Sequence, residues 1–169
     1  MAIHKITKLD GEIVMKPGTF SQLYIHLVFA VEFRQAMIND NAKNDVIKIV
    51  SNTINEIGHK TICINSMPDH IHILFGLNPT MSISETVHEI KRQSSYIINQ
   101  NKIFGNKFGW QAGYGAFSYS KSQIDHVCKY IKNQELHHQK LSFRDEYKLF
   151  LERYKIEYNE DYLFVFRDQ

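Results

Sequence analysis

The chain has 169 residues, of which 43% are hydrophobic and 22% are charged, and this is the composition of one ordinary globular domain with a real core. No apolar run approaches the ~20 residues that span a bilayer, and residues 1–8 lack the hydrophobic centre of a secretory signal, so we expect a cytoplasmic protein without a membrane segment. A net charge of +2 permits nucleic-acid binding without requiring it. The two cysteines, Cys63 and Cys128, show no CxxC spacing, and we interpret them as reduced core thiols.

The hydrophobic pattern predicts one domain over residues 19–169, preceded by a short extension. Residues 1–18 are polar and weakly patterned, and we interpret them as an N-terminal extension that forms a short hairpin at most. Alternation predicts a strand over residues 22–31. Helical spacing then predicts a helix over residues 41–57, which Asp40 or Asn41 caps and Gly58 ends. Strands over residues 60–66 and 70–77 flank a turn.

The second half of the chain completes a mixed fold. Ser82 and Glu85 form a capping box that opens a second long helix. Residues 101–115 read mainly as loop, residues 115–119 as a short strand, residues 120–138 as a helix and residues 143–154 as a last helix before an aromatic tail. The order indicates an α+β, ferredoxin-like split βαβ fold, an antiparallel sheet with helices on one face plus C-terminal helices. RNA-binding RRM domains share this plan, so the fold alone does not decide function.

The most informative motif is a pair of histidines separated by one apolar residue. His70 and His72 lie on the same face of the predicted strand, about 6.5–7 Å apart, while Ile71 points to the other face. Two imidazoles at this spacing can converge on one divalent cation, although at least one more protein ligand is needed. The alternative is a pair of solvated histidines on an open sheet face.

A polar stripe follows one flank of the helix predicted over residues 120–138. Tyr130 lies beside the apolar face of that helix, and Gln134 is its neighbour one turn later. A tyrosine hydroxyl becomes a competent nucleophile beside a metal-bound phosphate or a base. Gln134 offers a neutral carbonyl oxygen that suits a third metal ligand. The alternative is a boundary tyrosine with its ring on the core and its hydroxyl in water.

Together these residues resemble the small single-tyrosine HUH transposases of bacterial insertion sequences and the related REP-associated tyrosine transposases. The resemblance covers residues 22–164. It is carried by a histidine pair that follows Pro68-Asp69 and by a Tyr-x-x-x-Gln motif about 60 residues later. Further carriers are Leu27-Val28-Phe29-Ala30-Val31, residues 110–118, His137-His138 and Phe143-Arg144-Asp145-Glu146-Tyr147.

The resemblance implies a chemical mechanism. His70 and His72 would bind Mg²⁺ or Mn²⁺, with Gln134 as the third protein ligand, and Tyr130 would attack the scissile phosphorus of single-stranded DNA. The product would be a 5′-phosphotyrosine and a free 3′-hydroxyl, and attack by another 3′-hydroxyl would rejoin the strand. Asp69 would either orient a ligand histidine or only form the turn.

The resemblance also implies partners. Family members look like homodimers with sheets paired edge to edge, and the tyrosine helix of one subunit often serves the histidines of the other. We therefore expect a homodimer with this trans arrangement, although the sequence itself does not distinguish trans from cis placement. The DNA would carry hairpin ends. We expect phosphate contacts from cationic side chains on the two helices, namely Lys91, Arg92, Lys121, Lys129 and Lys132. Lys102 and Lys107 lie in the aromatic loop, and Phe108, Trp110 or Tyr114 could stack on unpaired bases or cover a small core.

Three other readings remain open at this point. A domesticated DNA nickase would have the same active site, and only its genomic context would distinguish it. A non-catalytic RRM-like module would show aromatic residues on the central strands, where this chain has His70 and His72. An unrelated metal hydrolase would use the histidine pair without needing Tyr130.

Overall fold

The computed structural model describes residues 7–9, 12–14, 20–32, 37–138 and 141–164 of the chain. Within the predicted N-terminal extension, β1 (Thr7–Leu9) pairs with β2 (Glu12–Val14) in an antiparallel hairpin. The rest of residues 1–18 lies outside the described part, as does the end of the aromatic tail beyond residue 164. Among the described residues, no helix combines the length and the apolar character needed to cross a membrane.

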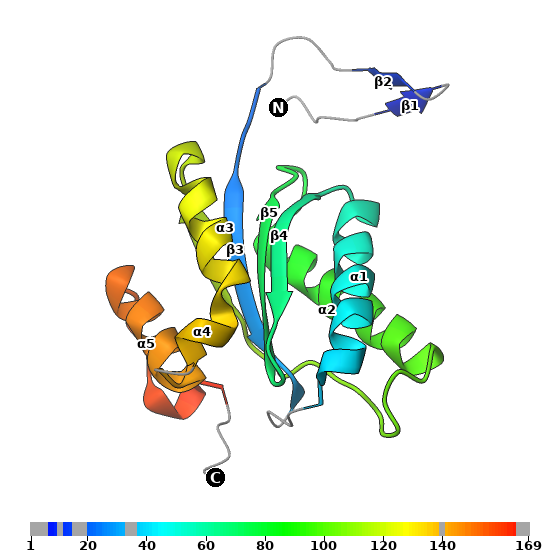
Figure 1. Cartoon of the computed structure of the whole chain (residues 1–169). Coiled ribbons are helices and arrows are strands. Elements are labelled where there is room, and N and C mark those ends of the chain that lie inside the picture. The colour runs from blue at the N-terminus through cyan, green and yellow to red at the C-terminus, as the bar shows by residue number, and fades with distance from the viewer. Residues whose placement is uncertain (1–6, 10–11, 15–19, 33–36, 139–140, 165–169) are drawn as a thin grey trace.

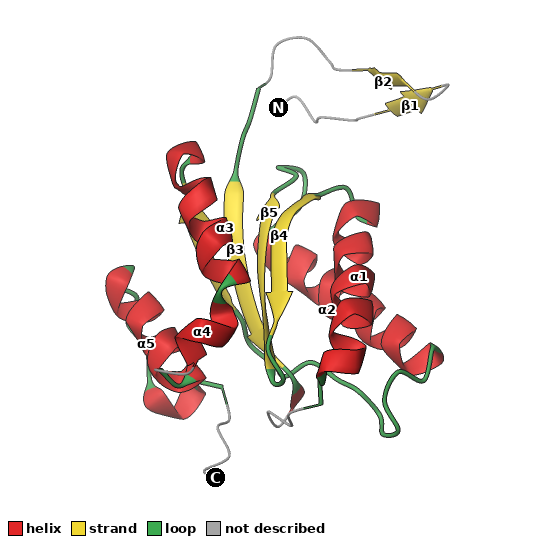
Figure 2. Ribbon diagram, viewed as in Figure 1, coloured by secondary structure: helices red, strands yellow, loops and turns green. Residues whose placement is uncertain are grey.

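A four-stranded antiparallel sheet forms the centre of the domain, in the order β4-β5-β3-β6 (Figures 1 and 2). This order confirms the predicted α+β, ferredoxin-like plan. The strand bounds lie within one or two residues of the prediction, because alternation and turns marked them clearly. The strands are β3 (Tyr24–Ala30), β4 (Lys60–Ser66), β5 (His70–Gly76) and β6 (Gly115–Tyr119).

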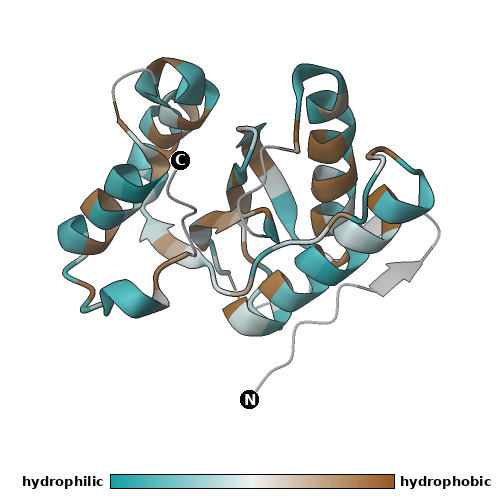
Figure 3. Cartoon of the chain, turned by 90° about the horizontal axis from the view of Figure 1, so that it is seen from below, coloured by the Kyte–Doolittle hydropathy of each residue, from teal (hydrophilic) through white to brown (hydrophobic). Residues whose placement is uncertain are grey.

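The two faces of the sheet are covered by different helices. Helices α1 (Asp40–Glu56) and α2 (Ile83–Gln100) pack on the face that receives Leu27 and Phe29 from β3. The opposite face receives Val28 from β3 and Phe117 from β6, and the C-terminal helices cover it. Figure 3 shows apolar residues, in brown, gathered where the helices meet the sheet. Strand alternation therefore builds two cores, one on each side.

Helix ends follow local hydrogen bonding. The cap of α1 is Asn39, whose side chain accepts a hydrogen bond from the backbone N–H of Ala42, so the prediction of Asp40 or Asn41 is wrong by one or two residues. Gly58 ends this helix at φ +90°, as predicted, because a side chain is strained in that region. The capping box predicted at the start of α2 is confirmed.

The helix predicted over residues 120–138 is broken in the structure. A 3-10 turn, Lys121–Gln123, leads into α3 (Ile124–Lys132), and a separate α4 (Gln134–His138) follows. At the break, the amide of Asn65 on β4 donates hydrogen bonds to the carbonyl oxygens of Ile131 and Lys132 at 2.9 and 3.4 Å. Those carbonyls would otherwise accept bonds from the next helical turn.

The last elements complete the second face of the sheet. Helix α5 (Phe143–Arg153) begins at Ser142, whose hydroxyl accepts the backbone N–H of Asp145, and a 3-10 turn, Glu160–Tyr162, follows. Cys63, which is buried on β4, and Cys128, which is partly buried on α3, are free thiols, as expected. The break before α4 turns the chain so that α4 and α5 reach the histidine face of the sheet.

Candidate functional site

The two histidines of the predicted pair point to the face that α3, α4 and α5 cover. His70 is 1% exposed and His72 is 0% exposed, so the alternative of solvated histidines on an open face is wrong. The Nδ1 atom of His70 lies 2.7 Å from Oδ1 of Asp69. The Nδ1 atom of His72 lies 3.1 Å from Nε2 of His26 on the neighbouring strand. Each ring therefore has one nitrogen engaged, and its Nε2 remains for a ligand.

Two further side chains reach the same point from the C-terminal helices. His138 of α4 places its Nε2 atom 3.1 Å from Nε2 of His70. Glu146 of α5 places Oε2 3.3 Å from Nε2 of His138 and 3.6 Å from Nε2 of His72. One ligand atom from each of these four residues lies within 4.8 Å of all the others. Residues from one strand and two helices thus form a single compact donor cluster.

Tyr130 and Gln134 meet at one oxygen of this cluster. The Tyr130 hydroxyl donates a hydrogen bond to Oε1 of Glu146, and the Gln134 amide donates to the same atom at 3.0 Å. The Tyr130 ring lies 6.1 Å from the ring of His72, between centroids. The structure therefore brings together the four residues that the sequence singled out, and Tyr130 stands beside histidines of its own chain.

Burial sets the charge of the cluster. It lowers the pKa of His70 from 6.5 to about 4, although the hydrogen bond to Asp69 opposes the shift. Burial likewise lowers the pKa of His72 to about 3 and holds the pKa of His26 well below 6.5. The same cause raises the pKa of Glu146 from 4.5 to about 7. At neutral pH, and without a metal ion, His70 and His72 are therefore neutral and the Glu146 carboxyl is close to half ionisation.

The hydrogen bonds in the cluster leave two lone pairs facing each other. The Leu141 carbonyl lies 3.1 Å from Nδ1 of His138 and can only accept, so that nitrogen carries the proton. The Asp69 carboxylate likewise accepts a hydrogen bond from the Nδ1–H of His70, so the Nε2 atoms of His70 and His138 bear lone pairs 3.1 Å apart. Two nitrogens bound to one ion at ~2.0–2.1 Å lie about 3 Å apart. Because burial disfavours a proton between them, this arrangement fits a divalent cation.

Buried polar atoms without partners point to the same conclusion. Among the described residues, these atoms include Nε2 of His72, Oε1 of Gln134 and Oε2 of Glu146. Each such atom, left unpaired in the interior, costs ~1–3 kcal/mol. The two oxygens carry lone pairs, as does Nε2 of His72 when its proton is on Nδ1, and a cation can satisfy several lone pairs at once. The donor set of imidazole, amide and carboxylate groups therefore fits a divalent metal ion.

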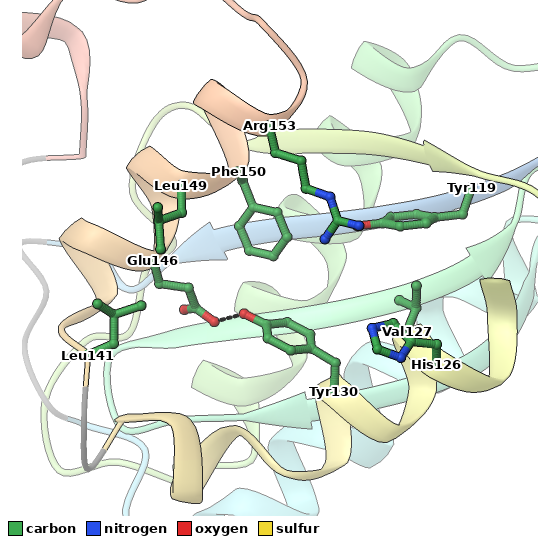
Figure 4. Close-up of a pocket in the computed structure, with 9 residues that line it drawn as sticks. All are labelled: Tyr119, His126, Val127, Tyr130, Leu141, Glu146, Leu149, Phe150 and Arg153. Atoms are coloured by element: carbon green, nitrogen blue, oxygen red, sulfur yellow. Dashed lines mark hydrogen bonds between the residues drawn. The ribbon is translucent and has the colours of Figure 1, made fainter.

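A cavity of about 200 Å³ opens beside the tyrosine (Figure 4). Figure 4 shows the side chains of Tyr130 and Glu146 directed toward one another within it. Aromatic rings form much of its wall. His126 and Arg153 also line the cavity, and both side chains are exposed to solvent. The cavity gives an outside molecule a route to the Tyr130 hydroxyl. Its lining consists of Tyr119, His126, Val127, Tyr130, Leu141, Glu146, Leu149, Phe150 and Arg153.

The cationic residues predicted to contact DNA occupy different settings. Lys91 is half-buried, and its ammonium donates to the carbonyl oxygens of Gln111, at 2.8 Å, and Gly113. Arg92 is exposed and pairs with Glu89 at 2.7 Å. Three exposed lysines remain on the elements around Tyr130, and their role in DNA binding stays a prediction. They are Lys121, Lys129 and Lys132.

The aromatic loop mainly covers a core. Phe108 is 1% exposed and packs edge-on against Trp110, whose indole N–H donates to Oγ of Ser94 at 2.8 Å. These two rings therefore fill the space over α2 rather than a surface. Tyr114 is exposed and keeps an accessible ring for stacking on a base.

Sequence reasoning missed three residues of the site. His26 carried a signal, because it alternates onto the same sheet face as the histidine pair. Glu146 carried another, because it is an acidic residue within the apolar stripe that Phe143 and Phe150 define on α5. His138 belongs to the His137-His138 motif named above, but the sequence did not indicate that the break before α4 turns its side chain toward His70.

Comparisons with known proteins identify the family of this chain. The family model of IS200-like transposases matches residues 19–134. The ISDra2 transposase TnpA of Deinococcus radiodurans is 25% identical over 123 residues, which cover 69% of this chain and 87% of that protein.

Two solved structures share the fold. A crystal structure of a transposase from Deinococcus radiodurans aligns with a TM-score of 0.57 and 22% identity, over 72% of this chain and 97% of that one. The structure of a REP-associated tyrosine transposase bound to a REP hairpin aligns with a TM-score of 0.54 and 14% identity, over 75% of this chain and 76% of that one. Because the family model spans well over half of the sequence, this chain belongs to the IS200-like transposase family.

Proposed function

We propose that this transposase is a metal-dependent enzyme that cleaves and rejoins single-stranded DNA through a 5′-phosphotyrosine on Tyr130. One observation carries the proposal. The Tyr130 hydroxyl donates to Oε1 of Glu146, while Oε2 of the same carboxyl faces the Nε2 atoms of His72 and His138. The nucleophile and the donor cluster are therefore joined by a single side chain.

The cation would be held by His70 and His72, with His138, Glu146 and the amide oxygen of Gln134 as further donors. When bound, it would polarise the scissile phosphate and stabilise the charge that develops on it. Imidazole is an unusual main ligand for Mg²⁺, and the mixed nitrogen and oxygen set suits Mn²⁺ better.

The chain's own groups supply the proton transfer and the nucleophile. Oε1 of Glu146 accepts the phenolic proton, because the Tyr130 hydroxyl already donates a hydrogen bond to it and a carboxylate in this position can act as a general base. The Tyr130 oxygen forms a bond to phosphorus, and the bond from phosphorus to the 3′-oxygen breaks. That oxygen takes the proton held by Glu146 and leaves as a 3′-hydroxyl. Attack by another 3′-hydroxyl reverses these steps and returns the proton to Tyr130.

The substrate we propose is a single strand with hairpin ends. The REP-associated tyrosine transposase of the same fold is bound to a REP hairpin. In this chain, the cavity beside Tyr130 would admit the strand, and Arg153 lies at that cavity. Lys129 and Lys132 are exposed on the helix that carries Tyr130, where they can contact phosphates on either side of the cut.

We further propose that two copies form a dimer through sheet edges. The outer strands of the sheet are β4 and β6, and an edge strand presents unpaired backbone groups to another chain. In this chain the ring of Tyr130 lies 6.1 Å from that of His72, between centroids, which supports a cis arrangement in place of the trans arrangement that the resemblance implies. The enzyme would act on bacterial DNA in the cytoplasm, on the nucleoid.

The test is incubation of the protein with labelled single-stranded DNA from the end of its own element, with Mn²⁺ or Mg²⁺, followed by a denaturing protein gel. We expect a covalent DNA–protein band that requires the metal and disappears in Tyr130→Phe. Cleavage that survives Tyr130→Phe without a covalent band would instead identify a metal hydrolase. Binding with neither cleavage nor a band would identify a non-catalytic module.

The structure argues against an RRM-like module but does not distinguish a domesticated nickase from a mobile transposase. An RRM-like module needs exposed aromatic residues on the sheet face, whereas helices α3, α4 and α5 cover this face and bury His70 and His72. That reading is therefore disfavoured. A domesticated nickase would have the same site, and the presence of flanking element ends in the genome distinguishes it from a mobile transposase.

A further inference from the structure

His26 lies outside the donor cluster but contacts it. The residue is on β3, is fully buried, and has its ring stacked on that of His72 with 5.3 Å between centroids. The other neighbours of His26 are aromatic rings, including those of Phe117, Tyr130 and Phe150. Its Nδ1 atom has no hydrogen-bond partner among the described residues. An apolar side chain would suit these surroundings better, so packing alone does not account for a histidine here.

The hydrogen bond between His26 and His72 uses one N–H proton, which one of the two rings must donate. Nε2 of His26 and Nδ1 of His72 lie 3.1 Å apart, and a neutral imidazole has one N–H and one lone pair. If His72 gives its Nε2 lone pair to a cation, its proton must be on Nδ1. His26 must then accept that proton through Nε2 and carry its own proton on Nδ1, where it finds no partner. The opposite assignment would place a proton on Nε2 of His72 and block it as a ligand.

We propose that His26 is a positioning residue that accepts the Nδ1 proton of His72 and thereby directs the Nε2 lone pair of His72 at the divalent cation. The inference rests on the metal-dependent function proposed above. It assigns to His26 the part that Asp69 plays for His70, where a carboxylate oxygen lies 2.7 Å from Nδ1. Groups behind the ligands fix ring orientation and the position of the proton in many metal sites.

The two orienting contacts differ in a way that can be tested. Asp69 precedes its ligand histidine in the chain, so the turn alone brings them together. His26 and His72 are 46 positions apart and meet only because β3 and β5 pair. Asp69 accepts through a carboxylate, whereas His26 must accept through a neutral ring whose other nitrogen is unpaired. Removal of the ring nitrogen from His26 therefore affects His72 without altering the contact at His70.

The experiment compares full-length variants by Mn²⁺ calorimetry and by ¹⁵N NMR of the Zn²⁺-loaded protein. His26→Leu removes the acceptor while keeping an apolar side chain, and His26→Gln keeps an acceptor near the Nε2 position. His59→Leu is the matched control, because His59 is a buried histidine whose contacts are with Asn78 and Thr86 and with none of the donor cluster. His70→Ala serves as the positive control for the metal site.

We expect Mn²⁺ affinity to fall about 10- to 100-fold in His26→Leu, to return toward the wild-type value in His26→Gln, and to stay unchanged in His59→Leu. In the Zn²⁺-loaded wild type, the spectrum should show a protonated Nδ1 and a metal-bound Nε2 on His72. Wild-type affinity in His26→Leu, equal losses in His26→Leu and His26→Gln, or Zn²⁺ on Nδ1 of His72 would each overturn the inference. Wild-type affinity in His70→Ala would overturn the metal site itself, and the inference with it.

Discussion

Replacing Glu146 by glutamine should stabilise the metal-free protein at alkaline pH. Burial raises the pKa of this carboxyl from 4.5 to about 7, so the fold resists its ionisation. Each unit between the folded and unfolded pKa corresponds to ~1.4 kcal/mol, which gives a cost of about 3 kcal/mol. Below pH 4.5 both states are protonated and the cost is absent. The cost to stability grows between pH 4.5 and 7, where Glu146 ionises in the unfolded chain before it ionises in the folded one. Above about pH 7 the cost reaches its full value.

Glutamine keeps the contacts of the protonated carboxyl. Its carbonyl oxygen can still accept the hydrogen bonds that Tyr130 and Gln134 donate to Oε1 of Glu146. Urea unfolding with EDTA at pH 8 should therefore show Glu146→Gln more stable than the wild type by up to about 3 kcal/mol. At pH 4.5 the difference should vanish. The surface variant Glu135→Gln is the control, and it should change stability by at most about 0.5 kcal/mol.

Metal should remove the advantage of the variant. Free Mn²⁺ at 1,000 times its dissociation constant would stabilise the wild type by about 4 kcal/mol, and a variant that lacks one anionic donor would gain less. The stability gap at pH 8 should then close. If Glu146→Gln without metal were less stable than the wild type at pH 8, or if Mn²⁺ stabilised both proteins equally, Glu146 could not be a buried carboxyl held ready for a cation.

Three further changes test other parts of the structure. Acidification should destabilise the metal-free Glu146→Gln variant from about pH 6.5 downward, because the pKa values of His70 and His72 fall to about 4 and 3 on folding and these two rings gain protons first in the unfolded chain; stability of this variant that stays flat to pH 4.5 in urea titrations would contradict this. Asn65→Ala should cost ~1–3 kcal/mol by leaving the carbonyls at the end of α3 unpaired, and faster amide exchange in α4 would report it. Gly115→Ala should cost ~1–3 kcal/mol in thermal unfolding, since its Cβ would lie 2.8 Å from the ring of Tyr147.

Local signals in the sequence predicted the sheet and most helix ends. The alternation of β3 placed Leu27 and Phe29 on one face, and the capping box at Ser82 marked the start of α2, because both signals act within a few residues. The break at Asn133 could not be predicted in this way. At that break the side chain of Asn65 donates to carbonyls more than 60 positions away.

The sequence predicted the two residue pairs of the candidate site but not the residue that joins them. His70 and His72 share a strand, and Tyr130 and Gln134 share a flank, so spacing alone grouped each pair. Joining the two pairs requires Glu146, whose carboxyl contacts both, and its place in the site follows from the packing of α5 on the sheet. Tertiary contacts between distant segments leave no periodic trace in a single sequence.

The division of the site between sheet and C-terminal helices also orders its assembly. The three strands β3, β4 and β5 and both α1 and α2 leave the ribosome before Tyr130, His138 and Glu146. Since chains fold from the N-terminal side during synthesis, the sheet can form with its histidines in place while the nucleophile and the carboxyl are still absent. A nascent chain can thus hold the histidine pair before Tyr130, His138 and Glu146 have been made. On the function proposed above, strand cleavage would become possible only once α5 has packed on the sheet.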